Sequence, residues 1–281
     1  MLRTRVITAV AILLLLLGML FLAPPLAWAI FVLVIALLGC WEWSRMSGLA
    51  RTAQGVFLAA SGAIGGVFFL LYAREADTYF MSAASFAFIV AALFWLVLAP
   101  LWLAGKARPS PIVCALAGWI VMWPTWFAFV VLRDASVWLL LAIAAVIWVA
   151  DIAAYFAGKR FGKHKLAPAV SPGKTWEGVI GALVGVAIYG IILALVANSR
   201  PTPISGIFDL GGGVPVVVAM LVLAALGIVG DLLESWMKRG VGLKDSSSLL
   251  PGHGGILDRI DALTSTLPVA AFALSLSMGS A

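Results

Sequence analysis

The sequence predicts an all-α protein that crosses a membrane many times, and two observations lead to this fold class. Hydrophobic residues make up 64% of the 281 residues and charged residues only 11%, whereas charged residues are about a quarter of an average soluble domain. The apolar runs are long and uninterrupted, unlike the alternation over about ten residues of a transmembrane barrel. Because hydrocarbon offers no hydrogen-bond partners, the backbone of these runs must pair with itself in helices.

Nine apolar segments are long enough to cross a membrane, because about 20 helical residues span its hydrocarbon core. The predicted spans cover residues 6–23, 26–43, 54–73, 80–104, 111–132, 136–157, 174–197, 214–237 and 261–279. Only Pro24 and Pro25 separate the first two spans, so the turn between them must be tight. Since no repeat and no low-complexity linker divides the chain, residues 1–281 are expected to form a single transmembrane domain.

The start of the chain also resembles a signal peptide. Arg3 and Arg5 precede an apolar run, and residues 27–29 read Ala-Trp-Ala, like a cleavage site. The apolar run over 6–23 is longer than the roughly 7–15 residues of a signal-peptide core, and a second span follows it directly. We therefore expect an ordinary first helix.

Basic residues indicate the orientation, because Lys and Arg are retained in the cytoplasmic loops of membrane proteins. With the N-terminus in the cytoplasm, only Arg74, Arg133 and Arg200 of the 18 Lys and Arg residues fall outside the cytoplasmic segments. An odd number of spans then predicts a periplasmic C-terminus. The same retention explains the net charge of +6, so no nucleic-acid partner is expected.

Charge is distributed unevenly, which places function in the second half of the chain. Residues 1–150 carry few charges, mostly at span ends, and are expected to pack, anchor the protein and shape a groove that faces lipid. Cys40 and Cys114 lie in apolar runs there, which predicts neither a disulfide nor a cysteine metal site. Residues 151–281 form the predicted catalytic part, whose cytoplasmic loops hold or adjoin both histidines and seven of the twelve acidic residues.

The first polar segment, residues 151–181, offers a site for an anion. Asp151 and Tyr155 are one helical turn apart and should share a face. Four cations follow in the loop, and then Ser171, Lys174 and Thr175 lead into a helix. Because backbone N–H groups at a helix start favour a bound anion, phosphate binding is predicted here.

Two alternatives bear on this first segment. A Walker phosphate loop would need glycine where Pro168 stands and a strand before it, and no strand is predicted. Contact of the cationic loop with anionic lipid headgroups explains its charge as well as a substrate site does. Phosphate binding therefore stays open in two forms, substrate or lipid surface.

The second polar segment begins on the span 214–237. Asp231, Glu234, Ser235 and Lys238 have the spacing i, i+3, i+4, i+7, which predicts one polar stripe on an otherwise apolar helix. Ionised side chains at that depth are costly unless they are paired, bind metal or face water. The stripe is therefore a candidate functional site.

Three carboxylates in this segment suit a magnesium ion. Asp258 and Asp261 are three residues apart at the start of the last span and can point the same way. Together with Asp231 they supply the hard oxygen ligands that Mg²⁺ prefers, and the glycines around His253 allow close backbone approach to a bulky anion. Carboxylates for metal and cations for phosphate are typical of phosphoryl or nucleotidyl transfer.

Other interpretations of the second segment remain open. Asp231, Lys238, Arg259 and Asp261 could form interhelical ion pairs, and His253 is either a hydrogen-bonding loop residue or a substrate contact. A transporter is disfavoured, because the charges gather at one membrane face and no inverted repeat is visible. A lipid-linked kinase or a glycosyl-phosphate transferase would use similar carboxylates and metal.

A longer pattern runs through the second segment. It consists of Ser235-Trp236-Met237-Lys238-Arg239, Lys244-Asp245, Ser247, Leu250-Pro251, His253-Gly254-Gly255 and Asp258-Arg259-Ile260-Asp261. This pattern resembles the signature of the phosphatidate cytidylyltransferases, or CDP-diacylglycerol synthases. The first segment is also similar to that family through Ser171-Pro172, Lys174-Thr175 and Glu177-Gly178. The two segments cover about a fifth of the chain, and we expect them to form one site.

The resemblance implies transfer of a cytidylyl group from CTP to phosphatidic acid, which yields CDP-diacylglycerol and pyrophosphate and requires Mg²⁺, with room for a second cation. It also implies a homodimer in the bacterial inner membrane, with the active site on the cytoplasmic side. The implied metal ligands are Asp231, Asp258 and Asp261, and the implied catalytic residues are these three with Lys238 and Arg259. The implied substrate-binding residues are Ser171, Lys174, Thr175, Glu177, Ser235, Arg239, Lys244, Asp245, His253, Gly254 and Gly255.

Overall fold

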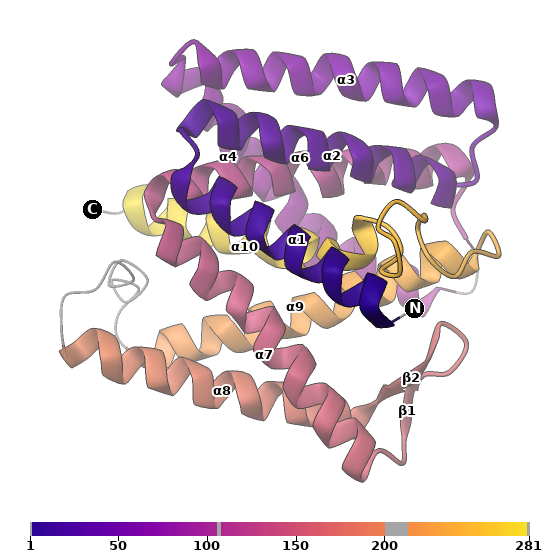
Figure 1. Ribbon diagram of the computed structural model, residues 1–281, viewed down its shortest axis with the longest axis vertical. Coiled ribbons are helices and arrows are strands. Elements are labelled where there is room, and N and C mark those ends of the chain that lie inside the picture. Colours follow the sequence, from indigo (N-terminus) through magenta and orange to yellow (C-terminus); the bar gives the residue numbers. More distant parts are fainter. Residues whose placement is uncertain (1, 106–107, 200–212, 280–281) are drawn as a thin grey trace.

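The computed structural model describes residues 2–105, 108–199 and 213–279, which form long helices and one small hairpin (Figure 1). The helices are α1 (Leu2–Leu22), α2 (Pro25–Met46), α3 (Arg51–Ala73), α4 (Asp77–Leu93), the π-helix η1 (Phe94–Leu98), α5 (Ala99–Ala104), α6 (Pro111–Ala135), α7 (Val137–Phe161), α8 (Trp176–Ser199), α9 (Gly213–Arg239) and α10 (Leu257–Gly279). The hairpin consists of β1 (Lys165–Ala167) and β2 (Ser171–Thr175). A helical class is thus confirmed.

Seven helical segments among the described residues are long and apolar enough to cross a membrane. They are Pro25–Met46, Arg51–Ala73, Asp77–Ala104, Pro111–Ala135, Val137–Phe161, Trp176–Val196 and Gly213–Arg239. This set confirms a multi-pass membrane protein. The predicted spans 6–23 and 261–279 correspond to α1 and α10, which fall outside that set, so the count of nine stays a prediction.

The hairpin is a correction to the predicted order of elements, in which no strand precedes the span 174–197. Lys165 pairs with Thr175 and Ala167 with Ser171 in antiparallel register, and α8 begins only at Trp176. The residues between the two strands and along β2 are rich in proline and glycine, which turn the chain and oppose a helix. The hairpin joins α7 to α8 and projects beside the ends of both helices (Figure 1).

The first half of the chain packs around α6, the most buried of the seven spans. Trp43 of α2 donates its indole N–H to the carbonyl of Cys114 in α6 (2.7 Å), and Trp28 does the same to Phe129 (3.1 Å). Trp43 fits there because a Cβ at Gly118 of α6 would overlap its ring. These buried tryptophans therefore join α2 and α6 through both packing and hydrogen bonds.

The second half brings α7, α8, α9 and α10 together. Helices α7 and α8 pack along their length and diverge from the rest of the bundle, while α9 and α10 cross beside them (Figure 1). At Gly230 of α9, an added Cβ would lie 2.6 Å from the Ser265 hydroxyl oxygen and 2.8 Å from the Asp261 carbonyl oxygen of α10. Glycine therefore allows α9 and α10 to approach closely beside Asp231.

Candidate active site

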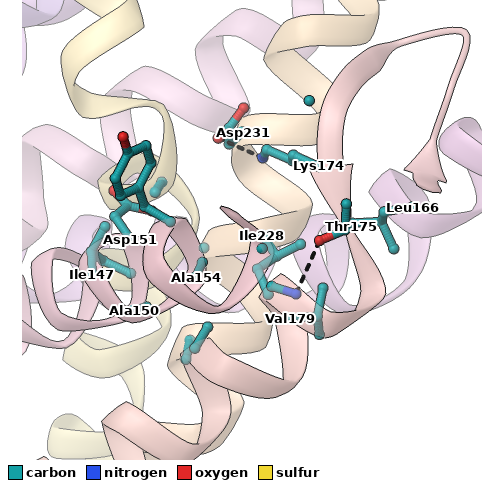
Figure 2. Close-up of a pocket in the computed structure, with 18 of the residues that line it drawn as sticks. Ile147, Ala150, Asp151, Ala154, Leu166, Lys174, Thr175, Val179, Ile228 and Asp231 are labelled. Atoms are coloured by element: carbon teal, nitrogen blue, oxygen red, sulfur yellow. Dashed lines mark hydrogen bonds and ion pairs between the residues drawn. The ribbon is translucent and has the colours of Figure 1, made fainter. Parts of the chain in front are cut away.

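A pocket of about 380 Å³ lies among α7, β2, α8 and α9 (Figure 2). Its polar lining consists of Asp151, Tyr155, Lys159, Lys174, Thr175 and Asp231. Its apolar lining includes Ile147, Ala150, Ala154, Leu166, Val179, Ala182, Ala224 and Ile228. Polar and apolar side chains thus line one cavity, which suits an amphiphilic ligand.

An ion pair joins the two predicted polar segments in this pocket. The Lys174 ammonium of β2 lies 2.5 Å from the Asp231 carboxylate of α9, and the two side chains are 27% and 31% exposed (Figure 2). Asp231 also accepts a hydrogen bond from Ser235 one turn later (3.3 Å). Asp151 of α7 lines the same pocket. The expectation that the two segments meet is therefore fulfilled.

The polar groups at the start of α8 make contacts within the protein. The Thr175 hydroxyl accepts a hydrogen bond from the N–H of Gly178 (3.1 Å) and so caps the helix (Figure 2). Glu177 lies 2.7 Å from the His164 ring at the base of the hairpin. Neither Glu177 nor Ser171 lines the pocket, so their predicted substrate contacts stay predictions without support from this geometry.

A second polar cluster lies at the C-terminal end of the stripe on α9. The Lys238 ammonium contacts Glu234 (2.6 Å) and Asp258 at the start of α10 (2.5 Å). The other oxygen of Asp258 accepts hydrogen bonds from Ser246 N–H (2.9 Å), Ser246 O–H (2.9 Å) and Gly255 N–H (2.7 Å). Burial opposes ionisation of Asp258, but Lys238 and these N–H donors outweigh burial and lower its pKa.

Comparisons with known proteins bear on what this site does. The profile of the cytidylyltransferase family matches residues 3–277. The chain belongs to the cytidylyltransferase family. It is 37% identical to the phosphatidate cytidylyltransferase of Pseudomonas aeruginosa, over 96% of this chain and 95% of that protein. It is 34% identical to the enzyme of that name from Haemophilus influenzae, over 95% and 96%, and 33% identical to the one from Brucella suis, over 93% and 89%.

The predicted metal ligands of this cytidylyltransferase are Asp231, Asp258 and Asp261. Among the described residues, no three His, Cys, Asp or Glu side chains lie close enough together to hold a metal ion. Asp258 is also fully engaged by Lys238 and by loop donors. Mg²⁺ usually takes only one or two carboxylates together with substrate phosphates, so the metal site at Asp231, Asp258 and Asp261 stays a prediction.

The loop between α9 and α10 and the adjoining helix ends carry further predicted site residues. Lys244 and Asp245 are exposed. The Arg239 side chain donates to the carbonyl of Leu243 (2.9 Å), and the exposed Arg259 side chain donates to the carbonyl of His253 (3.0 Å). The two arginines therefore stand at the surface with their side chains hydrogen-bonded to the loop, and none of these residues lines the pocket.

The glycines near His253 pack against the protein itself. Gly254 has a φ of +81°, and a Cβ there would lie 2.6 Å from the Asp258 carboxylate. A Cβ at Gly255 would overlap the Ser246 hydroxyl. His253 lies 3.4 Å from the Pro251 carbonyl through its Nδ1 atom. Close approach of this turn to a carboxylate is thus observed, whereas its approach to a substrate anion stays a prediction.

Glu42 of α2 is a polar residue that the sequence interpretation missed. It is 0% exposed, and its carboxylate accepts four hydrogen bonds from the 246–257 region. A signal was present, because a carboxylate inside an apolar run is costly unless it has partners. Those partners lie some two hundred residues later in the chain, so the sequence did not identify them.

Proposed function

We propose that this chain transfers the cytidylyl group of CTP to phosphatidic acid, forming CDP-diacylglycerol and pyrophosphate. The observation that carries the proposal is the Lys174–Asp231 pair in a pocket that also has apolar walls. A lysine beside a carboxylate suits a phosphate and its counter-cation, while apolar walls suit the lipid part of the substrate. The names of the three relatives support the same lipid substrate.

The chemistry requires positioning more than proton transfer. A phosphate oxygen of the lipid attacks the α-phosphorus of CTP in line, the bond to the bridging oxygen of the β-phosphate breaks, and pyrophosphate leaves. The attacking phosphate is already ionised at neutral pH, so the chain needs no strong general base. Lys174 neutralises phosphate charge in the pocket, and the exposed Arg239, Lys244 and Arg259 attract the triphosphate.

Magnesium is part of the proposal. Asp231 and Asp261 would hold the ion, because Asp231 lines the pocket and Asp261 directly precedes Ala262, which lines it too. The bound ion would neutralise charge on the triphosphate, and the same carboxylates would leave room for a second cation. In this arrangement Asp258, predicted as a third ligand, instead holds Lys238 and the loop.

The orientation in the membrane belongs to the same proposal. The start of α1, the hairpin and the loop between α9 and α10 lie toward one end of the bundle, and the end of α10 lies toward the other (Figure 1). Nine crossings of the bacterial inner membrane would put the first three in the cytoplasm, where CTP is found, and the C-terminus in the periplasm. We also propose a homodimer, on the resemblance described above.

The decisive assay uses purified protein in detergent with phosphatidic acid, CTP labelled in the α-phosphate, and Mg²⁺. We expect label in CDP-diacylglycerol, resolved by thin-layer chromatography and identified by mass spectrometry, and none when phosphatidic acid is omitted. Parallel reactions contain ATP or a sugar nucleotide in place of CTP. No lipid product from CTP, together with turnover of one of these nucleotides, would assign a different lipid-linked transfer.

A further inference from the structure

Glu42 connects the two halves of the chain at the start of α10. Its carboxylate accepts hydrogen bonds from the hydroxyls of Ser246 (3.0 Å) and Ser247 (2.5 Å) and from the backbone N–H groups of Ile256 (3.0 Å) and Leu257 (2.7 Å). All four donors belong to the loop that follows α9 or to the start of α10. A helix of the predicted packing half thus binds the catalytic half through one buried side chain.

The contacts to Ile256 and Leu257 give Glu42 the role of a helix cap. Leu257 is the first residue of α10, and the first N–H groups of a helix have no partner within it. Such groups are usually satisfied by a nearby Ser, Thr, Asp or Asn. Here the acceptor comes from α2 instead, and a carboxylate at a helix start also interacts favourably with the helix dipole.

Ser246 links Glu42 to Asp258. Its hydroxyl oxygen lies 3.0 Å from the Glu42 carboxylate and 2.9 Å from the Asp258 carboxylate, so its one O–H is within reach of both. Gly255 lies against the same group, because a Cβ there would overlap Ser246 and Glu42. Asp258 in turn contacts Lys238 of α9. A continuous set of contacts therefore runs from α2 through the loop to the polar stripe of α9.

We propose that Glu42 is a positioning residue for the cytidylyl transfer. It holds residues 246–257 and the first turn of α10 so that Asp258 meets Lys238 and Asp261 stays beside Asp231. It touches no substrate in this role. The inference rests on the proposed function for its catalytic readout, but the placement of the loop can be measured independently of any reaction.

The test compares Glu42→Gln with Glu75→Gln. Glutamine keeps the shape of the side chain but replaces one accepting carboxylate oxygen with an amide group that donates. Glu75, the control, is an exposed residue after α3. At saturating CTP and phosphatidic acid, we expect kcat to fall about tenfold or more in Glu42→Gln, since a buried donor that loses its acceptor shifts the loop and the start of α10. The kcat of Glu75→Gln should stay within about twofold of that of the unchanged protein, which corresponds to less than about 0.4 kcal/mol in activation free energy.

A labelling experiment separates positioning from a general loss of structure. Ser248 is exposed in the loop and both native cysteines are buried, so Ser248→Cys gives one accessible thiol among the described residues. With unchanged melting temperature, we expect its rate of maleimide labelling in detergent to change at least threefold when Glu42→Gln is added. A folded Glu42→Gln protein with normal kcat and an unchanged labelling rate would overturn the proposal.

Ser247→Ala keeps the proposal testable if Glu42→Gln does not fold. This change removes one donor to Glu42 and leaves its carboxylate in place. Lowered kcat with altered labelling of Ser248→Cys would support the positioning role, and normal values for both would overturn it. If the unchanged protein makes no CDP-diacylglycerol, the proposed function fails, whereas the labelling rates still report whether Glu42 orders the loop.

Discussion

Lys174 and Asp231 form a 2.5 Å ion pair between the hairpin after α7 and the polar stripe of α9. The two residues come from the two segments that the sequence singled out, and they meet in one pocket. This contact makes the hairpin part of the site, because β2 carries Lys174 to α9.

Replacing Lys174 with methionine should lower kcat/KM by about 100-fold or more, the usual effect of losing one charged group that stabilises a transition state. The change removes phosphate neutralisation and leaves Asp231 without its cation. Arg74→Met is the matched control, because Arg74 is exposed at the end of α3. Steady-state assays of CDP-diacylglycerol formation measure both, and a Lys174→Met protein with unchanged kcat/KM would remove this lysine from the mechanism.

Asp231→Asn and Asp258→Asn should fail in different ways. We expect Asp231→Asn to raise the Mg²⁺ concentration for half-maximal activity about tenfold or more, with its melting temperature unchanged. Asp258→Asn should instead lower the melting temperature, because it weakens contacts to Lys238 and the loop that are worth about 1–3 kcal/mol each when buried. A Mg²⁺ titration and thermal unfolding in detergent measure the two effects. The opposite result, a raised Mg²⁺ requirement in Asp258→Asn and a lowered melting temperature in Asp231→Asn, would make Asp258 the metal ligand.

Removing divalent cations should abolish formation of CDP-diacylglycerol, because uncompensated phosphate charge opposes the attack. Excess EDTA supplies the test, and added Mg²⁺ should restore the activity in full. Protein integrity is followed by thermal unfolding with and without EDTA, since a structural effect of the chelator would shift the melting temperature. Full activity in EDTA would contradict the proposed cation.

Gly255→Ala should destabilise the protein and lower its activity, because the new Cβ overlaps Ser246 and the Glu42 carboxylate. Gly66→Ala in α3 is the matched control: nothing lies within 4 Å of its Cβ position. Alanine is favoured over glycine inside a helix by about 0.5–1 kcal/mol, so Gly66→Ala should be neutral or slightly stabilising. Melting temperatures that fall equally for both variants would show that the crowding at Gly255 is unimportant.

A reporter fused after residue 281 should score as periplasmic, since nine crossings from a cytoplasmic N-terminus end on that side. Alkaline phosphatase, which is active only outside the cytoplasm, and a fluorescent protein that matures inside it give opposite readouts. The same pair fused after Lys244, in the loop that follows α9, should score as cytoplasmic. A cytoplasmic score at the C-terminus would change the number of crossings by one.

Much of the helical fold could be predicted because lipid leaves the backbone few options. Each predicted span has a corresponding helix, although α7 continues to Phe161 and η1 interrupts the span 80–104. The hairpin could not be predicted in the same way, because it lies outside the apolar runs and depends on pairing between Lys165 and Thr175. Hydropathy carries no information about such a pairing.

The candidate site was predictable in its residue types but not in its partners. The spacing of the stripe on α9 identified Asp231 and Lys238. It could not show that Lys174 takes the first and Asp258 the second, because these contacts depend on how α9, α10 and the hairpin pack. Glu42 was missed for the same reason, since its donors are distant in sequence.

The Glu42 contacts cross the boundary that composition places after residue 150. Composition divides the chain there, and every predicted catalytic residue falls after it. A fragment of residues 151–281 would nevertheless begin α10 without the carboxylate that accepts its first N–H groups. Neither part is therefore expected to be an independent catalytic module, and swaps between relatives should exchange α2 and α10 as a matched pair.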